Sequence, residues 1–103
     1  MFSHVMLGAN NIEESKEFYD QILAVLGARP GKLSLNHDGH TRYVYFVNNK
    51  NSFIISQPIN NEKASHGNGA TIGFNASSTD MVDEWYEAGK SAGGKDPELC
   101  DPP

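Results

Sequence analysis

Two stretches of the chain carry the same succession of apolar and polar positions. In residues 4–30, HVMLGANNIEESKEFYDQILAVLGARP, an alternating segment precedes a polar turn and then apolar residues at helical spacing. Residues 71–97, TIGFNASSTDMVDEWYEAGKSAGGKDP, repeat this order 67 residues later, so that Tyr19 aligns with Tyr86 and Gly27 with Gly94. The pattern predicts two copies of one strand–helix unit.

The first copy predicts a strand over residues 2–8 and a helix from Ile12 to Leu26. In the strand, Val5 and Leu7 are expected to face the helix, while His4, Met6 and Gly8 face away from it. The sequence NIEE provides a helix cap at its asparagine with a carboxylate three residues later, and the glycine after the apolar stripe is a typical helix stop.

Three further strands are predicted after this helix, over residues 32–37, 41–47 and 52–58. Asp38 and Gly39 separate the first two of them and indicate a two-residue hairpin. The segment TRYVYFV has the highest β-propensity in the chain. Residues 1–59 therefore predict one βαβββ unit.

The second unit is predicted to begin after a polar linker over residues 60–69. A strand over residues 70–76 should turn Ile72 and Phe74 to the core, and a helix capped by Ser77 or Ser78 should run to about residue 92. The buried side of this helix is expected to include Val82, Trp85 and Tyr86, and Gly93 and Gly94 should end it.

The part of the second unit that the chain contains, residues 70–103, has no room for three strands after its helix. The expectation is a single domain over residues 1–103 whose second unit is incomplete. Either the chain has been cut short, or a partner chain supplies the missing strands, since a sheet edge of this kind would otherwise stay unpaired.

Composition narrows the classes of function. The chain has 103 residues, a net charge of −5 and no cluster of Lys and Arg, which argues against nucleic acid or an anionic membrane as partner. It has no apolar run long enough to span a membrane and no recognisable signal peptide. A single cysteine, Cys100, fits a reducing cytoplasm.

The paired units resemble the vicinal oxygen chelate superfamily, which includes glyoxalase, bleomycin-resistance and extradiol dioxygenase proteins. The resemblance covers essentially the whole chain and is most specific in residues 2–30. It implies an α+β fold of paired βαβββ units, a small molecule enclosed by the concave face of the sheet, and a homodimer.

Members of this superfamily that use a divalent metal hold it with four ligands, one from the first and one from the last strand of each unit. His4 stands at the first of these positions. The second position falls near Ile54 and the third on Thr71, where the residue types are poor ligands, and the fourth would lie beyond Pro103. The metal-dependent activity therefore rests on one candidate ligand, His4.

Other candidate ligand-contacting residues are grouped by segment. Tyr43 and Tyr45 share one strand face, and Val44 and Phe46 share the other; one of these sets should line the concave side. The remaining candidates are Met6 beside His4, His66 in the linker, and Thr71, Gly73 and Asn75 in the second unit. His37 and His40 flank the hairpin turn and have no third metal ligand nearby in the sequence.

Three functions stay open at this point. The first is a lyase or dioxygenase type of enzyme in which a divalent metal polarises two adjacent oxygens of the substrate. The second is a metal-free protein that sequesters a drug or metabolite through aromatic and methionine contacts. The third is a structural or dimerisation module without a ligand.

Overall fold

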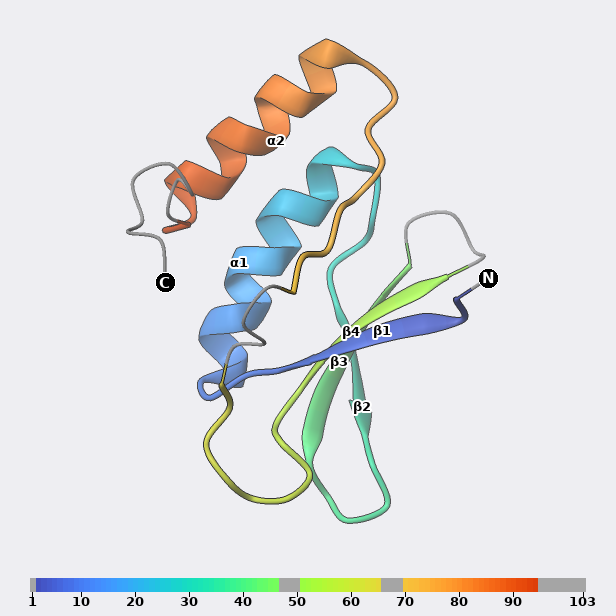
Figure 1. Ribbon diagram of the computed structural model, residues 1–103, viewed down its shortest axis with the longest axis vertical. Coiled ribbons are helices and arrows are strands. Elements are labelled where there is room, and N and C mark those ends of the chain that lie inside the picture. The colour runs from blue at the N-terminus through green and yellow to red at the C-terminus, as the bar shows by residue number, and fades with distance from the viewer. Residues whose placement is uncertain (1, 47–50, 66–69, 95–103) are drawn as a thin grey trace.

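The computed structural model describes residues 2–46, 51–65 and 70–94 (Figure 1). Along the chain the elements are β1 (His4–Gly8), α1 (Ile12–Val25), β2 (Lys32–Leu35), β3 (Thr41–Phe46), β4 (Ser52–Ser56) and α2 (Thr79–Ser91). The first five elements form the βαβββ unit that the sequence predicts.

The four strands form one mixed sheet in the order β1-β4-β3-β2. β1 runs parallel to β4, and β4, β3 and β2 are antiparallel in turn. This order follows from the connections along the chain. Helix α1 carries the chain from β1 across the sheet to β2, and two hairpins then bring it back to β4 in the middle. β1 and β2 are the two edge strands of this sheet.

Helix α1 lies against one face of the sheet, and α2 lies on α1 (Figure 1). Asn11 caps α1 by accepting a hydrogen bond from the Glu14 N–H at 3.1 Å, as predicted. Gly27, with φ at 95°, ends the helix in the left-handed conformation that glycine favours. The core between α1 and the sheet includes buried side chains of Ile22, Leu23, Tyr43, Tyr45, Phe53 and Ile55.

Helix α2 has the predicted cap but not the predicted buried side. Ser78 accepts a hydrogen bond from the Met81 N–H at 3.1 Å. Trp85 packs against the core, whereas Val82 and Tyr86 are 51% and 39% exposed. They remain exposed because α1 is the element against which α2 packs, and α1 covers only one stripe of α2.

The strand predicted over residues 70–76 is not formed. A β-strand requires backbone hydrogen bonds to a neighbouring strand, and none of the described strands pairs with these residues. The side-chain prediction is confirmed for Phe74, which packs between Phe53 and Trp85 with ring centroids at 5.3 and 6.4 Å. Ile72 is 37% exposed.

The hairpin between β2 and β3 also differs from the prediction. Its loop has three residues, because Asn36 and His40 still form a backbone hydrogen bond of 3.1 Å and the Gly39 N–H donates to the Asn36 carbonyl. Gly39 has φ at 84°, which is typical of a type I turn followed by a bulge.

Within the described residues, neither α1 nor α2 is long and apolar enough to cross a membrane.

Candidate ligand-binding site

The sheet has one face covered by α1 and one face that we call the open face. The strand register places the side chains of the open face in rows that cross the sheet. One row contains His4, Ser52 and Phe46, and the next contains Met6, Ile54, Val44 and Lys32. Met6 and Phe46 are 47% and 52% exposed, so the open face presents apolar surface to solvent.

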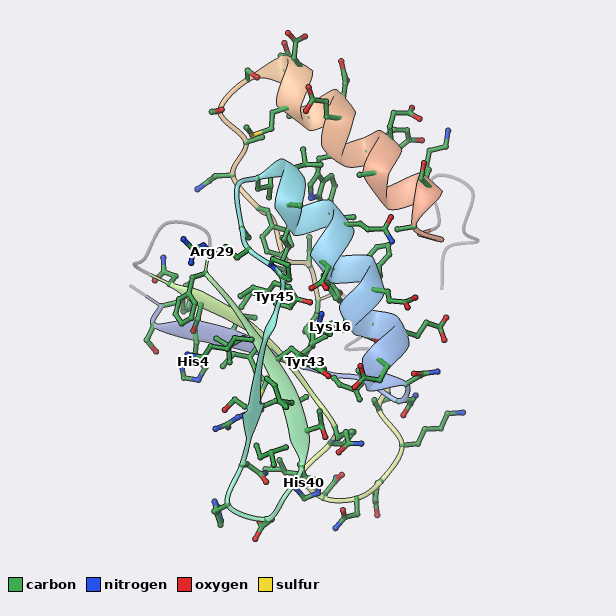
Figure 2. The ribbon with its side chains drawn as sticks, turned by 180° about the vertical axis from the view of Figure 1, so that it is seen from behind. His4, Lys16, Arg29, His40, Tyr43 and Tyr45 are labelled. Atoms are coloured by element: carbon green, nitrogen blue, oxygen red, sulfur yellow. The ribbon has the colours of Figure 1, made fainter. Side chains whose placement is uncertain are left out.

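His4 lies at one end of the open face, pointing away from α1 (Figure 2). Its Nδ1 is 2.8 Å from the Ser3 hydroxyl oxygen. His4 also lines a pocket of about 200 Å³ at the edge of β1, which Gly73 and Asn75 line from the second unit. The structure thus brings together three of the residues that the sequence singles out.

Tyr43 and Tyr45 lie on the other face, between the sheet and α1 (Figure 2). The Tyr43 hydroxyl donates a hydrogen bond to Glu13 at 2.7 Å, and the Tyr45 hydroxyl donates one to Asp20 at 2.7 Å. Of the two alternatives for this strand, Val44 and Phe46 therefore share the open face with His4 and Met6, and the tyrosines belong to the core.

These contacts affect the ionisation of both tyrosines. The hydrogen bond to Glu13, followed by burial, raises the pKa of the Tyr43 hydroxyl. Burial, followed by the hydrogen bond and charge of Asp20, raises the pKa of Tyr45 far above its ordinary value. Both hydroxyls are held protonated as donors to carboxylates, which is a structural role.

The other predicted residues are not gathered at one place. Thr71 is exposed in the segment without strand pairing, and it does not line the pocket that contains His4. His66 lies outside the described residues. His40 is held by Asn36 and by Asn61, whose side-chain oxygen is 2.8 Å from the His40 Nε2, and His37 is exposed beside Asp38.

The residues around His4 do not fit a divalent metal. Its partner on β4 is Ser52, Ile54 is diagonal to it on β4, and Met6 lies two residues along β1, so none of these described neighbours offers a carboxylate, imidazole or thiolate. No group of three His, Cys, Asp or Glu within residues 2–46, 51–65 and 70–94 is placed to hold a metal ion. A stable site normally needs three or more such protein ligands.

Two cationic side chains on the open face are not among the candidate residues that the sequence predicts. Lys32 on β2 is in the row of Met6, and Arg42 on β3 is in the neighbouring row, where its Nε donates to the Ser34 hydroxyl at 3.2 Å. Their positions could have been found from strand alternation, because Arg42 has the same parity as Val44 and Phe46. What alternation alone does not show is which parity faces the helix.

A larger hollow of about 750 Å³ lies on the covered side of β1, between α1 and the segment that leads to α2. Its lining includes Phe18, Phe74 and Trp85, and the Trp85 Nε1 is buried without a hydrogen-bond partner among the described residues. It also includes Ser65 and Ala70, the neighbours of the undescribed residues 66–69, and it does not include His4.

The fold and this open face define a class of α+β proteins built from βαβββ units. The chain matches the family described as Glyoxalase/Bleomycin resistance protein/Dioxygenase superfamily over residues 1–98, and it belongs to that superfamily. It is similar to the crystal structure of a glyoxalase/bleomycin resistance protein from Albidiferax ferrireducens, with 45% identity and a TM-score of 0.79. The match covers 90% of this chain and 72% of that one. No curated protein matches the chain.

Proposed function

We propose that this protein binds a small molecule on the open face of its sheet without the help of a metal ion. The observation that supports this proposal is the exposed apolar surface of Met6 and Phe46 on a sheet whose other face already holds the core. Exposed apolar area of this kind is typical of binding surfaces. The pocket that His4 lines at the edge of β1 is a separate hollow, because it is shared with Leu26 and Phe74 of the covered side and contains neither Met6 nor Phe46.

The metal-dependent lyase or dioxygenase is the second candidate. It is favoured by one observation, the exposed position of His4 on the open face. The serine and isoleucine of β4 beside His4 argue against it, since neither supplies the donor that a divalent metal would need. The residue types around His4 therefore favour sequestration of a drug or metabolite over a metal-dependent reaction, with His4 as a polar contact.

We further propose a homodimer that works in the cytoplasm. Superfamily members typically form dimers, and the edge strands β1 and β2 leave backbone groups available for pairing with a second chain. The single cysteine suits a reducing compartment. Sedimentation of the purified protein would test the dimer, and a monomer at all concentrations would contradict it.

Binding on the open face can be tested with the neutral fluorescent probe N-phenyl-1-naphthylamine. Met6→Glu places a charge in the middle of the open face and should weaken probe binding strongly. Leu33→Glu is the matched control, because Leu33 is 57% exposed but has the opposite parity on β2. Equal binding by both variants and the wild type would overturn the proposal.

A further inference from the structure

We propose that the molecule bound on the open face is an amphipathic organic anion, with a flat apolar body and one carboxylate, phosphate or sulfonate group. This inference rests on the proposed binding function and names the class of ligand. It comes from the distribution of charge over the two faces of the sheet.

The protein is acidic, with a net charge of −5, but its open face is not. Within the described chain the acidic side chains belong to α1, α2, the hairpin turn and the loop after β4: Glu13, Glu14, Glu17, Asp20, Asp38, Glu62, Asp80, Asp83, Glu84 and Glu87. None of them belongs to a strand. Among the described strand residues, the ionisable side chains on the open face are His4, Lys32 and Arg42.

Lys32 and Arg42 are close enough to act on one ligand group. Lys32 pairs with Val44 and Arg42 pairs with Ser34, so the two cations occupy diagonal positions on adjacent antiparallel strands. Such positions are about 7–8 Å apart between Cα atoms, within reach of long side chains. Among the described residues neither cation has a carboxylate partner, so their charge on this face is not neutralised.

The hydrogen bond to Ser34 uses only the Nε of Arg42 and holds the guanidinium close to the sheet. The terminal N–H groups of an arginine can then form the paired hydrogen bonds that suit a carboxylate or phosphate. An anion would meet a positioned arginine and an exposed lysine together.

The apolar part of the ligand has a place in the same row. Met6, Ile54 and Val44 follow one another across β1, β4 and β3, and Lys32 ends the row on β2. With strands about 4.8 Å apart, this row is about 14 Å long. That length suits a molecule of two fused or linked rings with its anionic group at the β2 end.

The test compares two probes that share their rings and differ in charge. The anionic probe is 8-anilinonaphthalene-1-sulfonate and the neutral one is N-phenyl-1-naphthylamine. The wild type should bind the anion more tightly by roughly three- to tenfold, the range expected for two partly exposed ion pairs. This preference should shrink as salt is raised from 50 to 500 mM, since salt screens such pairs.

The double variant Lys32→Gln/Arg42→Gln should lose the preference and keep its affinity for the neutral probe. Lys63→Gln, an exposed lysine in the loop after β4, is the matched control and should keep the preference. Circular dichroism of each variant ensures that probe binding is compared between folded proteins.

The outcomes separate this inference from the function on which it depends. Equal affinity of the wild type for the two probes, or a preference that survives in the double variant, would overturn the anion and leave the binding function standing. If Met6→Glu binds both probes as tightly as the wild type does, the binding function itself would be overturned. A change in sedimentation of the double variant without a change in probe preference would make the open face a contact between copies, and would also overturn the anion.

Discussion

At the scale of single residues, the carboxylate of Asp20 joins three parts of the chain. One oxygen accepts hydrogen bonds from the Gly31 N–H at 2.9 Å and from the Tyr45 hydroxyl at 2.7 Å, and the other accepts one from Lys16 at 2.6 Å. These contacts attach α1 to β3 and to the turn before β2. The pairing of Asp20 with Tyr45 could not be read from the sequence, because the two residues are 25 positions apart.

Removing the Tyr45 hydroxyl should destabilise the fold. Tyr45 is 1% exposed, and Tyr45→Phe leaves Asp20 without one of its donors. The expected loss is about 1–3 kcal/mol in the free energy of unfolding, as for hydrogen bonds to charged groups, and urea denaturation measures it. Tyr19→Phe is the control, because no hydrogen bond of its hydroxyl is found among the described residues, and a loss as large as that of Tyr45→Phe would contradict the assignment.

Asp20 should also make stability depend on pH. Burial by itself would raise its pKa, but the hydrogen bonds from Gly31, Lys16 and Tyr45 outweigh burial and lower the pKa. A carboxylate with a lowered pKa contributes its full stabilisation above the ordinary aspartate value and loses it as the pH falls through the folded-state value. The urea concentration at the unfolding midpoint should therefore decrease as the pH is lowered below about 4, where an ordinary aspartate becomes protonated. Asp20→Asn should be less stable at pH 7 and should show a shallower decline; an unchanged slope would argue against this role.

His4 should not by itself confer metal binding. His4→Ala removes an exposed imidazole that has Ser52, Met6 and Ile54 as its neighbours on the open face. We expect mass spectrometry for metals to find less than one ion per chain in the purified protein, with no change in the variant. One equivalent of a divalent metal that disappears in His4→Ala would instead support the metal-dependent enzyme.

At the scale of elements, the two helices have the same local signals and different surroundings. Both are capped by a side chain that accepts from a backbone N–H three residues later, Asn11 in α1 and Ser78 in α2. Local signals of this kind act within a few residues, so the sequence predicts both helices and both starts correctly. The prediction of a strand before α2 was wrong for the complementary reason, because the backbone partners of a strand are not local.

The cap of α1 should matter to the whole fold. Asn11→Ala removes the acceptor of the Glu14 N–H and should lower the free energy of unfolding by about 1 kcal/mol. Asn11→Asp retains an acceptor at the same place and should restore most of the loss. Chemical denaturation of the three proteins gives the comparison, and equal stability of all three would contradict a stabilising cap.

At the scale of the whole molecule, the layers differ in how firmly they are held. Helix α1 has Ile12, Ile22 and Leu23 buried and contacts the sheet, whereas no residue of α2 is fully buried and its helix neighbour is α1. Regions with few buried apolar contacts open at lower free energy than the core.

Helix α2 should therefore open before α1. In hydrogen exchange followed by mass spectrometry, peptides from α2 should exchange faster than those from α1 under native conditions. The two helices have 13 and 14 residues, so α1 is an internal control of nearly equal length. Equal protection of both helices would mean that they unfold as one unit.

The sequence by itself determined the elements of the first unit, the cap of α1, the cap of α2 to within one residue, the family and the alternation that puts His4 and Met6 on the same face. These follow from local sterics, capping hydrogen bonds and periodicity, which act over a few residues. Only the tertiary structure decided that Tyr43 and Tyr45 face α1, that Lys32 and Arg42 share the open face with His4, and that residues 70–76 lack strand pairing. Those outcomes depend on contacts between residues far apart in the chain, because the same alternating pattern fits either orientation of a strand until a helix covers one of its faces.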